Sequence, residues 1–440
     1  MKLSGWGRYP VLDCRVHTPR SPEAVRGHVG DGPLIPRGNG RSYGDSALNT
    51  GCTLSTARLN HMLSFDAEAA VLACESGVLL ADILNVFVPR GFFPPVTPGT
   101  KHVSVGGMIA ADVHGKNHHV AGSFGRHVLW MDIMVGSGEV MRCSADKNAE
   151  LFHHTIGGMG LTGVILRAAF KLVPVESAFI LSETLAAGTL DEVMEIFEDS
   201  ALWTYSVAWI DCSVAGPALG RSIFYRGEHC RLGELTGPKR ASPNRIVKRK
   251  TRNIPVELPG WVLNRSTMKA LNALYYWWGR LRPRVEIVDY DSFFYPLDAL
   301  GEWFRLYGRG GFLQYQCVLP KNQSREGLTR ILAAVARSGQ ASPLSVLKLF
   351  GPQEGVLSFP MEGYTLALDF PARPRVFDLL DRLDGIVADH GGHIYLAKDS
   401  RMAAAAFKKT QPNVEQFADF REAQSAAEHF ASHQSERLEL

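Results

Sequence analysis

Two groups of polar residues in the sequence have types and spacings that could do chemistry. His114, Lys116 and His118 lie in the run HGKNHH, where imidazole and ammonium groups could move a proton or hold a negative charge. Gln314 and Gln316 alternate along a predicted strand, so both side chains lie on one face and could hydrogen-bond sugar hydroxyls. The second pair is equally compatible with a half-exposed polar strand face, and both interpretations stay open.

Lys348 lies in a separate apolar run and could bind a phosphate or polarise a sugar. A zinc site at the histidines is not favoured, because no cysteine stands at ligand spacing and the flanking residues predict a loop. We therefore expect no metal. A serine nucleophile is also excluded, since no G-x-S-x-G elbow occurs.

A glycine-rich run, RGNGRSYGD at residues 37–45, follows a short apolar segment. Glycines at alternate positions let backbone N–H groups converge on an anion such as a pyrophosphate. The spacing does not match the Rossmann fingerprint, and no long helix is predicted to start there. Taken alone, the run is equally compatible with a structural turn.

Further clusters of small residues occur in the same part of the chain. Pro98-Gly99-Thr100 precedes Val105-Gly106-Gly107, and a last cluster, GGMGLTG, spans residues 157–163. Several close backbone approaches within a single lobe predict a long cofactor that lies between backbone segments. A dinucleotide is the natural candidate.

These residues need two kinds of scaffold to hold them. Residues 1–176 alternate short strand-like runs with helical pieces and contain the glycine clusters, which predicts the cofactor domain. Residues 177–415 alternate longer strand-like runs with helices, which predicts an antiparallel sheet with helices on one face. Residues 416–440 are polar and predicted helical. The fold class expected is α+β.

Composition excludes several classes of protein. The chain has 440 residues, a net charge of +3 and 21% charged residues, so nothing indicates a nucleic-acid partner. Seven cysteines without a CxxC pair predict free thiols. The N-terminus lacks an apolar signal region and no run of 18 apolar residues occurs, so we expect a cytoplasmic protein that does not span a membrane.

The strings GWGR, RGNGRSYGD, PGTKHVSVGG, HGKNHHVAGSFG and GGMGLTG together resemble the FAD-binding lobe (PCMH type) of the vanillyl-alcohol-oxidase superfamily. The likeness continues through FYPLD, KLFGP, LDFP and RLEL, so the chain is most similar to the decaprenylphosphoryl-β-D-ribose 2′-oxidase family. The resemblance implies a two-lobed FAD-binding domain, a substrate domain and a C-terminal segment that returns to the FAD domain. It also implies that FAD is the cofactor.

The resemblance implies roles for individual residues. Relatives with covalent FAD carry a histidine where Arg41 stands, so we expect non-covalent FAD. The expected catalytic residues are His114, Lys116, Gln316 and Lys348. The expected substrate residues are Gln314, Gln316, Lys348, Tyr205, Trp209 and Phe350, although the aromatic ones could equally be core. The residues expected around FAD are Arg37, Gly38, Asn39, Gly40, Arg41, Ser42, Tyr43, Pro98, Gly99, Thr100, Gly106, Gly107, Ala111, His114, Gly115, His118 and Gly163.

One departure from the family pattern stands out. The family's C-terminal segment carries a lysine followed by Val-Asp-Pro, and the resemblance implies that this lysine reaches flavin and substrate. Here Ala423 occupies that position. We therefore expect a missing cation, for which Lys398 or Arg421 could substitute.

The resemblance implies oxidation of the ribose 2-hydroxyl of a polyprenyl-phosphoryl-β-D-ribose to a keto sugar, the first half of an epimerisation to the arabinose donor used in cell-wall synthesis. A separate NAD(P)H-dependent keto-reductase would complete the epimerisation. Two alternatives stay open. One is an alditol or aldonolactone oxidase that acts on a soluble sugar, and the other is a catalytically impaired flavin-binding partner protein.

A basic and aromatic stretch at residues 239–278 is not explained by these roles. Seven cations from Lys239 to Arg252, including Lys248, precede a segment with Trp261, Tyr275, Tyr276, Trp277 and Trp278. Such a stretch is typical of a solvated loop that leads into a core helix. It is also typical of a contact with an anionic membrane surface, which would make the protein peripherally membrane-associated.

Overall fold

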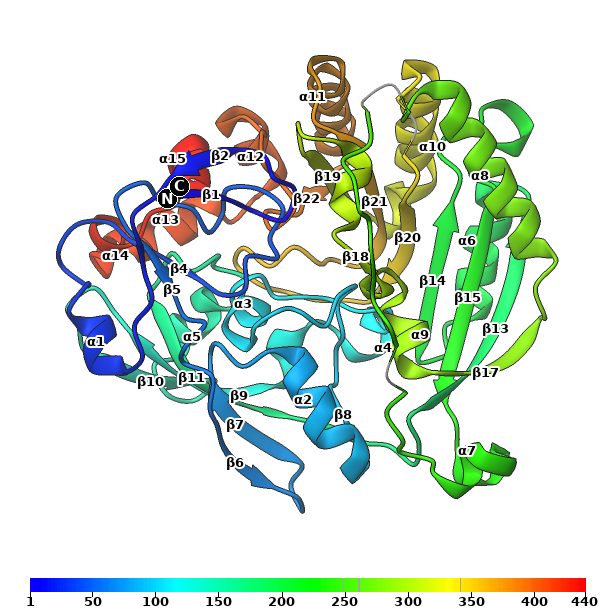
Figure 1. The fold of residues 1–440 in the computed structure, drawn as a ribbon. Helices are drawn as coiled ribbons and strands as arrows, with labels where there is room; N and C mark the ends of the chain where they lie inside the picture. Colours follow the sequence, from blue (N-terminus) through cyan, green and yellow to red (C-terminus); the bar gives the residue numbers. More distant parts are fainter. Residues whose placement is uncertain (248, 260–261, 341) are drawn as a thin grey trace.

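Short, glycine-interrupted strands build the first lobe of the chain, and long uninterrupted strands build the second (Figure 1). The computed structural model describes residues 1–247, 249–259, 262–340 and 342–440. The two termini lie close together on the first lobe (Figure 1). Lys248 and Trp261, which belong to the basic and aromatic stretch, lie outside the described residues.

The first lobe is organised around a five-stranded antiparallel sheet. Its central strand, β11 (Val164–Lys171), is buried on both faces, and helix α2 (Leu80–Phe87) packs on the sheet through Leu80, Ile83 and Leu84. That i, i+3, i+4 spacing gives the helix one apolar face. The sheet follows the order β10 (Val140–Ser144), β9 (Val128–Met134), β11, β7 (Val71–Glu75) and β6 (Met62–Asp66).

Smaller elements complete this lobe and carry the glycine clusters. The remaining strands are β1 (Lys2–Ser4), β2 (Val11–Asp13), β3 (Val16–His17), β4 (Ile35–Arg37), β5 (Thr53–Ser55), β8 (Phe92–Phe93) and β12 (Val173–Pro174). The helices are α1 (Pro22–Arg26), α3 (Val105–Ala110), α4 (His118–Ala121) and α5 (Ala149–Thr155). The run at residues 37–45 begins at Arg37, the last residue of β4, so the pairing of β4 with β5 fixes the start of the loop.

The second lobe is an eight-stranded antiparallel sheet. Its order is β17 (Val285–Asp289), β13 (Phe179–Ala187), β15 (Ser222–His229), β14 (Tyr205–Ile210), β20 (Ser345–Phe350), β21 (Gly363–Pro371), β19 (Phe312–Pro320) and β22 (His393–Ile394). A short parallel pair, β16 (Arg252–Asn253) with β18 (Leu300–Gly301), lies outside this sheet. The helices are α6 (Leu190–Asp199), α7 (Gly237–Ala241), α8 (Arg265–Arg280), α9 (Tyr290–Phe294), α10 (Lys321–Ser338) and α11 (Pro374–Asp389).

The two faces of this sheet have different neighbours. Phe224 of β15 packs edge-on against Phe197 of α6 at 4.7 Å between ring centroids, whereas the next residue, Ile223, touches α8 at Gly279. Successive strand residues point to opposite faces, so α6 and α8 lie on opposite sides of the sheet. Helices α10 and α11 also pack on strand β19 (Figure 1).

The C-terminal segment returns to the first lobe (Figure 1). It comprises α12 (Ala404–Thr410), α13 (Val414–Ala423), α14 (Ala426–His429) and α15 (His433–Leu438). Phe430 bridges to Leu34, and Arg437 of α15 donates to Asp45 Oδ1 at 2.8 Å and to Asp399 Oδ2 at 2.9 Å. Arg437 thereby links helix α15 to Asp45, the last residue of the glycine-rich run.

The α+β fold class and the antiparallel sheet are confirmed. The expectation that helices cover only one face of this sheet is wrong, because α6 and α8 pack on opposite faces. Strand β12, which ends at Pro174, pairs with β8 of the first lobe, whereas β13, which begins at Phe179, belongs to the sheet of the second lobe. The boundary predicted at residue 176 lies between them, and the division into domains stays a prediction. Ala423 lies exposed at the end of α13, away from the cavity described below. Position 423 does not face this cavity, so the alanine there removes no cation from the cavity wall.

Candidate active site

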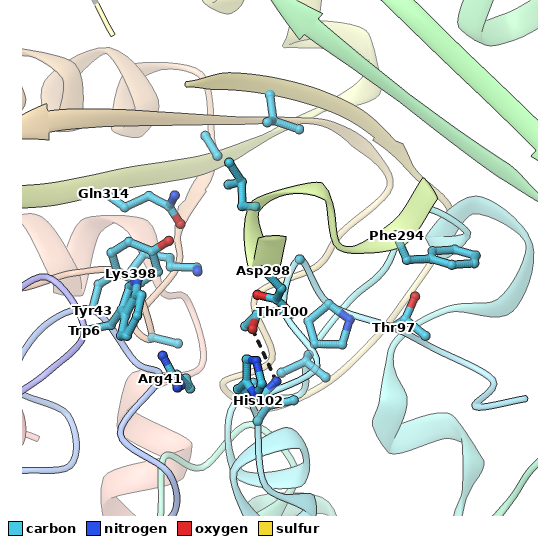
Figure 2. Close-up of a pocket in the computed structure, with 18 of the residues that line it drawn as sticks. Trp6, Arg41, Tyr43, Thr97, Thr100, His102, Phe294, Asp298, Gln314 and Lys398 are labelled. Atoms are coloured by element: carbon cyan, nitrogen blue, oxygen red, sulfur yellow. Dashed lines mark hydrogen bonds between the residues drawn. The ribbon is translucent and has the colours of Figure 1, made fainter. Parts of the chain in front are cut away.

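A cavity of about 1350 Å³ lies between the two lobes and is lined by residues of both (Figure 2). Pockets for a single drug-sized ligand are roughly 300–1,000 Å³. The space therefore suits a long cofactor together with a substrate. The predicted residues that line it are Gly38, Asn39, Gly40, Arg41, Ser42, Tyr43, Pro98, Gly99, Thr100, Gly106, Gly107, Ala111, His114, Gly115, Lys116, Gly163, Trp209, Gln314, Gln316 and Lys348.

The glycine-rich run forms one wall as a backbone nest. The N–H groups of residues 38–42 donate to no acceptor within the described ranges of the chain. Gly40 has a φ of +63°, which glycine adopts without strain, and a Cβ on Gly38 would lie 2.0 Å from Ser104 Oγ. Consecutive unpaired N–H groups beside a cavity suit an anionic ligand such as a pyrophosphate.

Helix α3 continues this wall with small residues. Ser104 caps the helix by accepting from the Gly107 N–H, and a Cβ on Gly106 would lie 2.9 Å from Ser76 Cβ. Around Gly99 a Cβ would meet no described atom within 4 Å, so the backbone there faces open space. The helix is thus held close to its neighbours while its cavity side stays free for a flat ligand.

The sheet of the second lobe supplies the opposite wall. Gln314 and Gln316 are alternate residues of β19, and Lys348 lies on β20. Gln316 donates from Nε2 to Thr365 Oγ1 at 3.1 Å, and the same nitrogen lies 2.9 Å from His114 Nε2. The two glutamines therefore face the cavity, and Gln316 joins the sheet to the HGKNHH run of the first lobe.

Three lysines, Lys116, Lys348 and Lys398, project into the cavity wall. Burial away from bulk water lowers the pKa of Lys116 to about 7 and of Lys348 to about 8. The Lys348 charge contributes to the shift at Lys116. Lys116 also donates to the backbone carbonyl of Phe293. Amines with such pKa values exchange protons near neutral pH and attract an anion when protonated.

Of the two residues named as possible substitutes for the missing cation, Lys398 lines the cavity and Arg421 does not. The Nζ of Lys398 lies 3.9 Å from the ring centroid of Tyr43, and Figure 2 shows it beside Tyr43, Trp6 and Gln314. Burial lowers the pKa of Lys398 to about 7, although the nearby Asp369 carboxyl opposes the shift. Burial raises the pKa of Asp369 to about 7, and Asp369 accepts from Gln314. This lysine precedes Asp399, which binds Arg437 of the C-terminal helix.

Four predicted contact residues do not line the cavity, so the structure does not bring them together with the others. Arg37 turns away to donate to Ser4 O and Ala47 O and braces the loop. His118 lies behind the wall with Nε2 2.9 Å from Gln353 Oε1. Tyr205 is buried against Phe294, at 4.8 Å between ring centroids, and Phe350 packs behind His114 at 4.8 Å.

Several cavity residues had no clear signal in the sequence. His102 and Asp298 lie near the middle of the view in Figure 2. The backbone N–H of His102 donates to Thr100 Oγ1 at 3.2 Å. Trp6 lies under Arg41, with the guanidinium carbon 4.2 Å from the ring centroid. The GWGR string marked Trp6, but nothing in the spacing placed Asp298 or Lys398 at the cavity. Arg421, the other candidate substitute, instead donates to the carbonyls of Leu161 and Phe430.

Three further features concern metal binding, membrane spans and cysteines. Within residues 1–247, 249–259, 262–340 and 342–440, no cluster of three or more His, Cys, Asp or Glu side chains is arranged to hold a metal ion. The same described segments contain no helix with both the length and the apolarity needed to cross a bilayer. The seven cysteines are free thiols, mostly buried.

Comparison with known proteins identifies the ligand that these walls fit. A family described as FAD binding domain matches residues 20–144, which contain the nest, α3 and the HGKNHH run. The nest suits the pyrophosphate of FAD, and the small-residue wall suits its flat, extended shape. FAD is thus the cofactor of this chain.

Relatives extend the match beyond the cofactor lobe. Decaprenylphosphoryl-beta-D-ribose oxidase of Mycolicibacterium smegmatis is 37% identical over 451 residues, covering 100% of this chain and 97% of that protein. An uncharacterized protein in the mprA 5′ region of Streptomyces coelicolor is 34% identical over 373 residues, 82% of this chain and 100% of that one. L-Gulonolactone oxidase of Bos taurus is 30% identical over 160 residues, 36% of this chain and 35% of that one. Because the first likeness spans both cavity walls, the chain belongs to the decaprenylphosphoryl-β-D-ribose oxidase family and is an FAD-dependent oxidoreductase.

Proposed function

We propose that this enzyme oxidises the ribose 2-hydroxyl of a polyprenyl-phosphoryl-β-D-ribose to a 2-keto sugar. The observation that carries the proposal is the lining of the cavity around the nest, where two glutamines and three lysines, Gln314, Gln316, Lys116, Lys348 and Lys398, face the same space. Amide side chains suit sugar hydroxyls, and ammonium groups suit a sugar phosphate. Bound FAD supplies the two-electron acceptor that the oxidation of an alcohol requires.

The protein's own groups orient the sugar and handle the hydroxyl proton. Gln316 uses its amide hydrogens on His114 and Thr365, which leaves its carbonyl oxygen to accept from a hydroxyl. A lysine that is neutral near pH 7 can receive the hydroxyl proton, and Lys398 is suited to this because burial lowers its pKa to about 7. Lys348 and Lys116, when protonated, hold the phosphate.

The keto sugar must be reduced to complete an epimerisation to the arabinose donor for cell-wall synthesis. We assign that step to a separate NAD(P)H-dependent keto-reductase. Since NAD(P)H is a cytoplasmic reductant, the proposal places both enzymes at the cytoplasmic face of the membrane that carries the lipid.

The alternative of a soluble alditol or aldonolactone as substrate is less well supported. The likeness to L-gulonolactone oxidase covers 36% of the chain, whereas the likeness to decaprenylphosphoryl-beta-D-ribose oxidase covers 100% of it. A catalytically impaired flavin-binding partner is not favoured either. Its support was the missing lysine at position 423, and Lys398 supplies a cation at the cavity instead.

The test is anaerobic bleaching of the flavin absorbance. Polyprenyl-phosphoryl ribose should bleach the holoenzyme, whereas free alditols and aldonolactones at the same concentration should not. Bleaching by a free polyol with equal efficiency would replace the lipid-linked substrate by a soluble one. If no sugar alcohol bleaches a protein that retains its FAD, the oxidase proposal is wrong.

A further inference from the structure

Helix α8 presents an apolar stripe to solvent. Leu274, Trp277 and Leu281 are 67%, 57% and 80% exposed, and Leu271 and Trp278 extend the same stripe. Positions 271, 274, 278 and 281 recur every three or four residues, so they lie on one side of the helix. Single exposed leucines are ordinary on a protein surface, but a contiguous stripe with two tryptophans indicates a binding surface.

The opposite side of α8 is firmly seated, so the stripe is not a core face left open. Met268, Asn272, Tyr276 and Gly279 are buried against the sheet. A Cβ on Gly279 would lie 2.6 Å from the Ile223 side chain, which shows how closely the helix approaches β15. The outer side of the helix can therefore bind another surface while the inner side stays packed on the sheet.

The sequence segment that contains α8 carries charge of one sign. No aspartate or glutamate occurs from residue 258 to residue 285, while five cations do, at positions 265, 269, 280, 282 and 284. Of these, Arg284 pairs with Glu183 of β13 at 2.8 Å. Arg280 lies 5.1 Å from the Trp277 ring centroid, and Arg282 lies 4.1 Å from that of Trp278. Cations placed beside half-exposed tryptophans are typical of surfaces that bind anionic lipid headgroups.

The stripe continues into the cavity. Tyr275, Trp278 and Arg282 line the cavity wall, although Trp278 is also exposed to solvent. The cavity thus opens beside the exposed side of α8. A lipid whose sugar phosphate lies among the cavity lysines has a direct route for its chain along this helix.

We infer that α8 is a membrane-docking helix that rests on a bilayer containing anionic lipid, with Leu274, Trp277 and Leu281 in the interface and the cavity mouth against the membrane. The inference rests on the proposed function in one respect, namely that the substrate comes from the bilayer. It assigns the membrane contact to the part of the basic and aromatic stretch that lies in α8, together with Arg282, which follows the helix. Lys239 donates to the Ile287 carbonyl and Arg249 pairs with Asp289, so these two cations have partners within the protein.

A second copy of this chain is a poorer occupant of the surface. Two copies that met through α8 would bring two sets of cations together with no acidic residue of the 258–285 segment to offset them. Juxtaposed like charges weaken such an interface. An anionic bilayer offers both the apolar phase and the opposite charge.

The experiment is sedimentation of FAD-loaded protein with vesicles of phosphatidylcholine containing phosphatidylglycerol. The wild type should bind, should bind less at high salt, and should show a blue shift in tryptophan emission. The double variant Leu274→Ser with Leu281→Ser should bind roughly tenfold more weakly, because two apolar side chains no longer reach the interface. The matched control is Leu202→Ser, at a site that is 97% exposed in another part of the second lobe, and it should bind as the wild type does.

Flavin bleaching by detergent-dispersed polyprenyl-phosphoryl ribose separates the two proposals. The double variant should bleach as fast as the wild type in detergent and more slowly when the substrate is in vesicles. Vesicle binding without bleaching would leave the docking helix standing and remove the substrate assignment. Equal vesicle binding by the double variant and the wild type, or a dimer in sedimentation velocity that the double variant abolishes, would overturn the docking helix.

Discussion

Gln316 Nε2 lies 2.9 Å from His114 Nε2, and this contact links residues 202 positions apart in sequence across the two lobes. The amide donates, so the histidine accepts at Nε2 and carries its proton on Nδ1. Burial, reinforced by the Lys348 charge, lowers the pKa of His114 well below its ordinary value. His114 is therefore a neutral ring that fixes the orientation of Gln316 toward the cavity.

The cavity lysines predict the pH dependence of the reaction. If a neutral lysine accepts the hydroxyl proton, kcat/KM should rise with pH through an apparent pKa near 7, where Lys398 titrates. Lys398→Met should lower the rate of flavin reduction by about 10²–10⁴-fold and flatten this profile, while the protein stays yellow. Stopped-flow absorbance gives both values. A Lys398→Met enzyme with the wild-type profile would assign the proton to another group.

Lys348 separates substrate binding from proton transfer. Because burial lowers its pKa to about 8, it is mostly protonated at pH 7 and suits a phosphate. Lys348→Met should raise the substrate concentration needed for half-maximal bleaching at least tenfold while leaving FAD content unchanged. Normal bleaching by this variant would remove Lys348 from the substrate site.

Buried neutral histidines predict loss of stability in acid. Burial lowers the pKa of His118 to about 3 and of His229 to about 4, from an ordinary 6.5. Below pH 6.5 the unfolded chain binds protons that the folded chain cannot, so stability is complete above that pH and falls as the pH drops. Each histidine contributes about 1.4 kcal/mol per pH unit in that range. His118→Gln should reduce the fall in Tm between pH 7 and pH 5, whereas His153→Gln, on the surface, should not.

The nest predicts a glycine requirement. Gly38→Ala would press on Ser104 Oγ, which caps α3, and should lower FAD affinity about tenfold with a loss of roughly 1 kcal/mol of stability. Gly385→Ala is the matched control, because a Cβ there meets no described atom within 4 Å and alanine favours its helix α11. The ratio of flavin to protein absorbance measures the FAD content of each variant. Full FAD content in Gly38→Ala would show that the loop adapts.

Arg41 predicts that the flavin is released by acid. An arginine cannot form the bond to the flavin that a histidine forms in covalent relatives, and here its guanidinium lies over Trp6. After precipitation with acid, the flavin should be in the supernatant and the protein should have its unmodified mass. Flavin that stays with the pellet would contradict this.

The overall architecture could be predicted because its signals are local. Alternating and fully apolar runs marked strands such as β14 and β20, and 3.6-residue periodicity marked α10 and α11. The glycine-rich run indicated the nest only together with the further clusters of small residues, since alone it was equally compatible with a structural turn. The aromatic residues Tyr205 and Phe350 could not be assigned to cavity or core, because both sides of a strand in a doubly covered sheet are apolar.

The position of Lys398 at the cavity could not be predicted from local patterns. Lys398 reaches the cavity because the chain after β22 folds back beside Tyr43, whose N–H donates to the Ala397 carbonyl. That contact joins residues more than 350 positions apart, and no local pattern encodes it. Comparison of motifs aligned the family's lysine with Ala423, where the structure has an exposed helix end, and so predicted a missing cation.

The contact between Arg437 and Asp45 spans 392 positions, so it has a consequence for how the protein is made. On the ribosome, residues 38–45 emerge long before the helix that holds them in place. Until α15 is complete, the buried carboxyls of Asp45 and Asp399 lack their guanidinium partner. The glycine-rich run therefore gains this support only after residue 437 has been translated.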